Sequence, residues 1–125
     1  KDYVEAQWLV LQQKKPEDFV IATGKQYSVL EFINTASKYL NMKIQWRGKG
    51  LSKIGSFLGK DIIKIDPKYF RASEVQTLLG DASKAKKKLG WSPKISFKEL
   101  VKEMVVEDLK LIKNNKINFN QKITK

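Results

Sequence analysis

The sequence predicts a small α/β fold in which helices alternate with a few short strands. Stretches with apolar residues at helical spacing alternate with only three β-like runs, which are too few for a full doubly wound sheet. No segment repeats along the chain. The 125 residues, 42% of them hydrophobic, suffice for one modest core.

The first predicted elements are a helix and a short strand. Residues 3–14 are expected to form a helix that ends before Pro16. Its apolar face would contain Val4, Trp8 and Leu11. The β-like run 18–22 follows and stops at the turn signal of residues 23–24.

A second helix is predicted to begin at Ser28, because Ser28 and Glu31 have the spacing of a capping box. Its buried stripe would contain Val29, Ile33, Ala36 and Leu40. A short strand over residues 44–46 then leads into the glycine-rich stretch 47–60. We expect that stretch to be a loop with room for one hairpin-like excursion.

The strongest strand pattern covers residues 61–66 and ends at Pro67. A short helix over residues 84–89 follows, with Asp81 or Ser83 as its cap and Gly90 as the residue that ends it.

The last predicted helix covers residues 97–114 and opens with a capping box of Ser96 and Glu99. Asp108 interrupts its apolar stripe. The tail, 114–125, is rich in Lys and Asn and lacks acidic residues, so we expect it to be a frayed basic tail.

The composition restricts the classes of function. The absence of Cys and His excludes disulfides, the commonest zinc ligands, a Cys nucleophile and a His general base from this chain. No run of 18 apolar residues suggests a membrane span, so we expect a cytoplasmic protein. The net charge of +12 is consistent with an anionic partner. However, the basic residues are almost all Lys spread along the chain, which favours solvated surface over a nucleic-acid footprint.

No cofactor or metal site is expected in this chain. No G-x-G-x-x-G segment links a strand to a helix, and Gly48, Gly50 and Gly55 lie in the long predicted loop instead. The acidic residues are scattered and do not form the paired arrangement of a metal or glycosidase site.

One constellation indicates binding. Arg71, one of only two arginines, follows the strongest strand, and Glu74 lies three residues further on. A guanidinium there could bind a diphosphate through two parallel hydrogen bonds, and the carboxylate could accept hydrogen bonds from ribose hydroxyls. The alternative is a surface Arg–Glu pair at helical i,i+3 spacing, which the residues alone slightly favour.

Several ordered blocks resemble the C-terminal part of GDP-mannose 4,6-dehydratases, which belong to the extended short-chain dehydrogenase/reductase family. These blocks are K-D-Y-V-E-A-Q-W at 1–8, E-D-F-V-I-A-T-G at 17–24, W-R-G-K-G-L at 46–51, D-P-K-Y-F-R at 66–71, S-E-V at 73–75, L-G-W at 89–91 and E-L-V at 99–101. The L-G-W block recurs in many extended short-chain enzymes, whereas the ordered series is specific to this branch.

The resemblance implies that residues 1–113 form the nucleotide-sugar-binding lobe of a Rossmann-type enzyme. Arg71 would then bind the diphosphate of GDP-mannose and Glu74 the ribose, which reverses the preference for a surface pair. In the family, a Tyr with a neighbouring Lys, together with NADP, carries out an internal redox elimination of water. Those groups are expected in an N-terminal Rossmann lobe that this chain lacks, so we assign it no catalytic residue and expect it to be inactive alone. A homo-oligomer is expected for the full-length enzyme.

The chain departs from the family pattern at Arg47, where Glu is common, at Ala72, where Pro is usual, and at Gln76, where an acidic residue is usual. These departures concern the affinity for the ligand more than the identity of the family. Three alternatives stay open: part of a related nucleotide-sugar epimerase or reductase, an inactive remnant, or a stand-alone anion-binding module.

Overall fold

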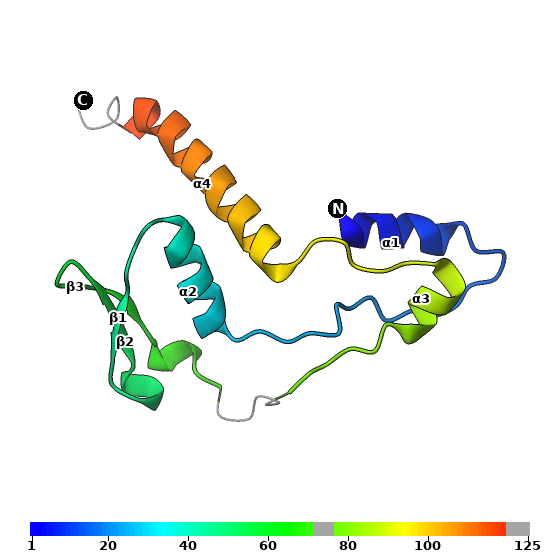
Figure 1. Ribbon diagram of the computed structural model, residues 1–125, viewed down its shortest axis with the longest axis horizontal. Coiled ribbons are helices and arrows are strands. Elements are labelled where there is room, and N and C mark those ends of the chain that lie inside the picture. The colour runs from blue at the N-terminus through cyan, green and yellow to red at the C-terminus, as the bar shows by residue number, and fades with distance from the viewer. Residues whose placement is uncertain (72–76, 120–125) are drawn as a thin grey trace. The chain divides into compact units, whose positions relative to one another are not determined.

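The computed structural model describes residues 1–71 and 77–119, with side chains described as far as residue 113. In chain order it contains α1 (Asp2–Leu11), α2 (Val29–Tyr39), β1 (Gln45–Arg47), the 3-10 turn η1 (Gly50–Ser52), β2 (Ile54–Phe57), β3 (Lys60–Lys64), the 3-10 turn η2 (Pro67–Tyr69), α3 (Ser83–Leu89) and α4 (Phe97–Phe119) (Figure 1).

The chain forms two compact units, each discontinuous in sequence. Unit 1 consists of the described residues of Lys1–Ser28 and Glu74–Ser96 and contains α1 and α3. Unit 2 consists of the described residues of Val29–Ser73 and Phe97–Lys125 and contains the three strands, α2 and α4.

The core of unit 1 is small because two alanines form its centre. Ala6 of α1 packs with Ala85 and Leu89, which lie one helical turn apart on α3, and with the indole of Trp91, which is only 2% exposed. Partly buried apolar residues surround this centre: Leu9, Val10, Phe19, Ile21 and Ala82. Gly90 ends α3 in the left-handed conformation at φ 67°, as predicted, and so allows the chain to turn into Trp91.

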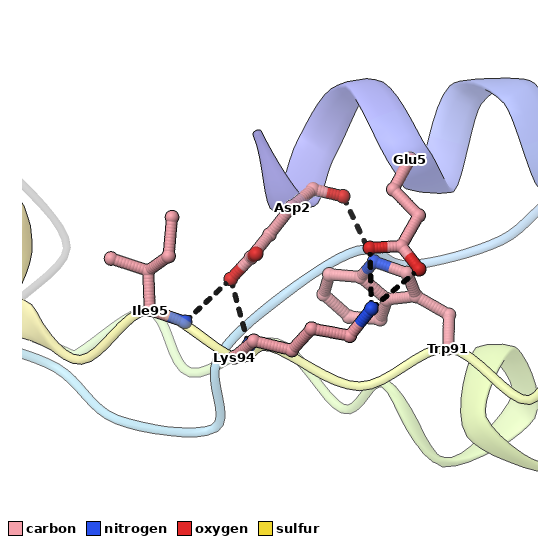
Figure 2. Close-up of polar contacts among 5 residues, drawn as sticks. All are labelled: Asp2, Glu5, Trp91, Lys94 and Ile95. Carbon is pink, nitrogen blue, oxygen red and sulfur yellow. Dashed lines mark hydrogen bonds and ion pairs between the residues drawn. The ribbon is translucent and has the colours of Figure 1, made fainter.

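Asp2 joins the start of unit 1 to its end (Figure 2). Its backbone oxygen accepts a hydrogen bond of 2.9 Å from the Trp91 indole N–H. Its carboxylate Oδ2 accepts the backbone N–H groups of Lys94 and Ile95 at 2.8 and 2.9 Å. The Lys94 ammonium also pairs with Glu5 of α1 at 2.7 Å. Residues about ninety positions apart in sequence are thereby held together.

Residues 17–19 are held against α3 by ion pairs and a hydrogen bond from its lysines. Glu17 accepts the Lys88 ammonium at 2.6 Å and lies 3.1 Å from that of Lys84. Lys84 also donates to the Asp18 backbone oxygen at 2.8 Å and lies 4.9 Å from the centre of the Phe19 ring. These contacts orient the extended segment along the helix.

The strand predicted over residues 18–22 does not form within the described chain. A strand requires a neighbouring strand to complete its hydrogen-bond ladder, and all three strands of the described chain belong to unit 2. The segment is instead packed by side chains. A Cβ at Gly80 would lie only 2.7 Å from that of Ala22, so the backbone at residue 80 approaches the segment closely.

The predicted core face of α1 was wrong. Trp8 is 60% exposed, and Val4 and Leu11 are exposed as well, whereas Ala6 is buried. The helix therefore carries apolar residues on two faces. Only the face that contains Ala6 packs within unit 1. The Trp8 indole is consequently not part of the core that its position suggested.

Unit 2 contains a three-stranded antiparallel sheet of order β1-β2-β3. Gly55, at the centre of β2, pairs with Trp46 on one side and Ile63 on the other. A Cβ at Gly55 would lie 2.9 Å from the Trp46 ring, so glycine leaves room for that indole to lie across the strand. The β2–β3 turn has positive φ at Leu58 and Gly59, as tight hairpins require.

The sheet is connected to a pair of helices. The Trp46 indole N–H donates to the Asn34 side chain of α2 at 2.9 Å. Helices α2 and α4 pack together, with the Phe32 and Phe97 rings edge to face at 6.4 Å, and Val101 of α4 is fully buried.

The remaining predictions for unit 2 were partly right. Helix α2 begins directly after Ser28, as predicted, but Val29 and Leu40 are exposed rather than part of its buried stripe, and Leu40 lies beyond the end of the helix. The expected loop 47–60 contains both η1 and β2. Helix α4 continues to Phe119, further than expected, and residues 120–125 lie outside the described chain. No described helix is long and apolar enough to cross a membrane.

We predict that Trp91→Phe destabilises the protein by about 1–3 kcal/mol, because the Asp2 oxygen loses its donor. Trp91→Ala should cost about 3–5 kcal/mol, because a cavity is added. Urea denaturation followed by circular dichroism measures both. Trp8→Phe, at an exposed indole, is the matched control and should change stability by less than about 0.5 kcal/mol. An equal loss at both tryptophans would contradict the packing described for unit 1.

Acid stability should depend on Asp2. The backbone N–H of Ile95 holds the pKa of the Asp2 carboxyl below its usual value of 3.8, aided by the N–H of Lys94. A folded pKa below the unfolded one stabilises the protein at pH values above about 4, and this stabilisation is lost as the pH falls through the lower folded pKa. Asp2→Asn should therefore lower stability at neutral pH and weaken its dependence on acid, measured by thermal melts from about pH 2 to 7.

Asp18→Asn provides the control, because the Asp18 side chain forms no hydrogen bond with the described part of unit 1. An acid profile that is the same in Asp2→Asn and the unsubstituted protein would refute the role of this carboxylate.

Candidate functional site

Arg71 stands at the end of a short, well-braced turn in unit 2. The Asp66 carboxylate accepts the Lys68 backbone N–H at 2.9 Å, and the Asp66 and Pro67 carbonyls accept those of Tyr69 and Phe70 at 3.1 and 3.2 Å. Pro67 pre-sets the backbone angle at the start of η2. The turn thus fixes the backbone from which Arg71 extends.

The Arg71 guanidinium is available to a ligand. The residue is exposed and forms no hydrogen bond or ion pair with the residues that the structure describes. Two large aromatic residues precede it, Tyr69 and Phe70, and both are more than half exposed. An exposed planar cation that follows two exposed aromatic residues in the chain is suited to an anionic ligand that also has an apolar or aromatic part.

The second predicted site residue, Glu74, lies outside the described residues, as do Ala72 and Gln76. The structure therefore does not bring Arg71 and Glu74 together, and their shared site stays a prediction.

Arg47, the other arginine, has a structural role that sequence analysis missed. Its guanidinium donates to the Ser56 hydroxyl at 2.9 Å and to the Asp61 carboxylate at 2.7 Å. Ser56 in turn lies opposite Asp61 in the sheet and donates to it at 3.3 Å. The network therefore links β1 to β3 across β2. The hydrogen bond from Arg47 lowers the pKa of the Asp61 carboxyl.

The departure at Arg47 thus has a local explanation. A Glu at this position would face the Asp61 carboxylate, whereas Arg complements it. The sequence signal was the pair of opposite charges at 47 and 61, but it is recognisable only once the three strands are placed in register.

The glycine-rich stretch folds on itself. Ser52 donates to the Lys49 carbonyl at 2.7 Å and accepts from the Lys49 N–H at 3.3 Å. A Cβ at Gly48, where φ is 75°, would lie 2.2 Å from the Ser52 carbonyl oxygen. These glycines accordingly allow a tight 3-10 turn next to a strand, which differs from the strand-to-helix turn that holds a dinucleotide.

A pocket of about 280 Å³ opens within unit 1 between residues 22–24, the start of α3 and residues 91–93. Its one carboxylate, Asp81, accepts hydrogen bonds from both the backbone N–H and the hydroxyl of Ser83, which lower the pKa of its carboxyl. The N-cap of α3 is Ala82, which forms no side-chain capping hydrogen bond, and the Asp81 carboxylate before it accepts the first backbone N–H of the helix. Among the described residues, no three acidic side chains gather into a possible metal site.

Comparison with known proteins identifies relatives. A sequence family described as GDP-mannose 4,6 dehydratase matches residues 1–104. A GDP-mannose 4,6 dehydratase of Dictyostelium discoideum is 54% identical over 116 residues, which is 91% of this chain and 33% of the relative. A GDP-mannose 4,6-dehydratase of Vibrio cholerae is 50% identical over 123 residues, or 89% of this chain and 33% of the relative.

A similar match is found in animals. The GDP-mannose 4,6 dehydratase of Drosophila melanogaster is 48% identical over 118 residues, covering 93% of this chain and 30% of the relative. The chain therefore spans about a third of the length of the curated relatives that it matches.

The two arginines should differ in reactivity. We predict that phenylglyoxal, which modifies guanidinium groups, reacts several-fold faster with Arg71 than with Arg47, because Asp61 and Ser56 hold the latter. Mass spectrometry of the digested chain measures the extent of modification at each arginine separately. Asp61→Asn should speed the reaction at Arg47 and leave Arg71 unchanged. Equal rates at the two sites would contradict the assignment of their environments.

Proposed function

The chain belongs to the GDP-mannose 4,6-dehydratase family, and we propose that it forms the nucleotide-sugar-binding part of an enzyme that converts GDP-mannose to GDP-4-keto-6-deoxymannose. The observation that carries the proposal is the family match over residues 1–104. This stretch contains Arg71, which is exposed and forms no ion pair with the residues that the structure describes. Relatives that share about half of its residues over this stretch are named for the dehydration of GDP-mannose.

In this proposal Arg71 holds the diphosphate. A guanidinium presents parallel N–H groups that match two phosphate oxygens, and its charge persists at any physiological pH. The braced turn η2 supports the role, because a fixed backbone limits the entropy lost when the ligand binds. Glu74 is proposed to accept hydrogen bonds from the ribose hydroxyls.

The residues described do not fit NADP. The glycines of 48–55 line a 3-10 turn and a strand, and no described strand leads through a glycine-rich turn into a helix. We propose that NADP, which supplies hydride transfer, is held by the Rossmann lobe of the full-length enzyme, together with the catalytic residues. This chain would then contribute no catalytic residue and be inactive alone.

Binding the non-reacting end of the substrate would still accelerate the reaction. Holding the diphosphate and ribose fixes the position of the mannose ring relative to the groups that act on it, which removes much of the entropic cost of the chemical step. We propose that the two units form the substrate-binding part of an extended short-chain dehydrogenase/reductase. The cytoplasmic location and the homo-oligomer stay predictions.

Protection of Arg71 from phenylglyoxal by added ligands distinguishes a site for GDP-mannose from a site for the substrates of related epimerases and reductases. GDP-mannose should slow the reaction of phenylglyoxal with Arg71 and leave Arg47 unaffected, whereas UDP-glucose should protect Arg71 less. Stronger protection by UDP-glucose would favour a UDP-sugar enzyme. Protection by single-stranded DNA alone, with a steep dependence on salt, would favour the anion-binding module.

The catalytic role is testable in a chimaeric enzyme in which this chain replaces the matching third of the Vibrio cholerae relative. We predict that Arg71→Ala raises KM for GDP-mannose by about 10- to 100-fold, as expected for loss of charged hydrogen bonds, with a much smaller change in kcat. Arg71→Lys should recover part of the affinity, because the charge remains while the planar fork is lost.

The control is Arg47→Lys, which keeps a cation beside Asp61 in the sheet and should leave KM near that of the unsubstituted chimaera. An unchanged KM in Arg71→Ala would refute the assignment of Arg71 to the substrate.

A further inference from the structure

We propose that one exposed face of α4 binds the same face of a second copy of this chain, with the two helices antiparallel. This face, named here the α4 stripe, consists of Leu100, Met104 and Leu111. The inference goes beyond the proposed function, because it concerns a surface between two protein chains rather than the binding of a nucleotide.

The first observation is that α4 is about twice as long as the helix that covers it. Helix α4 contains 23 residues and α2 contains 11, which correspond to roughly 34 and 16 Å of helix (Figure 1). Val101, near the start of α4, is fully buried, whereas Leu109 and Ile112 are exposed. Because α2 is the only other α-helix in the described part of unit 2, the second half of α4 has no partner helix there.

The second observation is the spacing of the exposed apolar residues. Positions 100, 104 and 111 are four and seven residues apart, and such spacings recur on one side of an α-helix, as in the seam of a coiled coil. The side chains of the α4 stripe are 46, 44 and 58% exposed. Single exposed apolar residues are ordinary, but a row along three helical turns favours burial against another apolar row.

The third observation is the distribution of charge along α4. Residues 97–108 contain four acidic residues and two lysines, whereas residues 109–119 contain three lysines and no acidic residue. A parallel pair of these helices would place like charges together. An antiparallel pair places the acidic half of one helix beside the basic half of the other, so charge complementarity selects a second copy in the antiparallel orientation.

One register satisfies both the apolar contacts and the charges. When Leu100 faces Leu111 of the second copy, the twofold symmetry repeats this contact at the other end of the stripe. Glu103 and Lys110 each directly precede a residue of the α4 stripe, so both lie along the same edge of it. The register therefore places Glu103 beside Lys110 of the second copy, and it does so twice in each dimer.

The acidic residue within the row is compatible with this register. Glu107 lies between Met104 and Leu111, and its carboxylate pairs with the Lys110 ammonium of the same helix at 2.7 Å. In the antiparallel dimer this ammonium would lie near two carboxylates, that of its own Glu107 and that of Glu103 from the second copy. The negative charge in the row is thereby compensated by a lysine at its edge.

The test is sedimentation equilibrium of the 125-residue chain with charges exchanged along α4. Lys110→Glu and Glu103→Lys should each weaken the dimer about 10-fold, because two ion pairs become two repulsive contacts. The double variant, Glu103→Lys with Lys110→Glu, restores opposite charges in the antiparallel register and should dimerise within about 3-fold of the unsubstituted chain. Lys102→Glu, two residues from both Leu100 and Met104 and so on the other side of the helix, is the matched control and should leave the dimer unchanged.

An apolar substitution tests the stripe itself. Leu111→Gln should weaken the dimer about 10-fold, because each dimer loses two apolar contacts. Leu58→Gln, at an 85% exposed leucine in the β2–β3 turn of the same unit, should not change it. Circular dichroism establishes that each variant retains the fold of the unsubstituted chain.

Three results would overturn the inference. The first is a chain that stays monomeric up to about 1 mM. The second is a dimer that none of the α4 substitutions weakens, since its interface would then lie elsewhere. The third is a double variant that remains as weak as the single ones, since the helices would then not be antiparallel in this register. None of these results bears on the role of Arg71, because GDP-mannose should protect it from phenylglyoxal equally in Leu111→Gln.

Discussion

The hydrogen bonds around Asp2 hold together the two stretches of chain that form unit 1. Its two stretches of chain are distant in sequence, and two of the four residues at its apolar centre are alanines, which bury little surface. The indole of Trp91 supplies most of the buried bulk, and its N–H must find an acceptor away from water. Asp2 provides that acceptor and at the same time binds the chain that follows the indole (Figure 2).

In unit 2 the corresponding constraint is steric. Gly55 leaves space for the Trp46 indole, which reaches Asn34 and so connects the sheet to the helices. The same hairpin continues through β3 into η2, so the position of Arg71 within unit 2 derives from this packing. The proposed binding residue on this exposed turn is thereby supported by a sheet, which is the usual arrangement for binding residues on loops.

The two arginines have different surroundings, which the composition of the chain does not distinguish. Both contribute to the net charge of +12. Arg47 lies beside an acidic residue of the same sheet, where its charge is compensated. Arg71 follows a turn that contains an exposed tyrosine, with its charge uncompensated by the described residues. A diffuse excess of Lys indicates no partner, whereas one uncompensated guanidinium is consistent with a particular class of ligand.

The sequence by itself determined the features that depend on neighbouring residues: the start of α2 after Ser28, the end of α3 at Gly90, and the ordered motifs that identify the family. Only the tertiary structure decided which elements find partners. The run 18–22 has strand propensity but no neighbouring strand among the described residues, and Trp8 follows helical periodicity yet lies on the exposed face. Periodicity reports local backbone preference, whereas burial and ion pairing, as at Arg47, depend on what packs opposite.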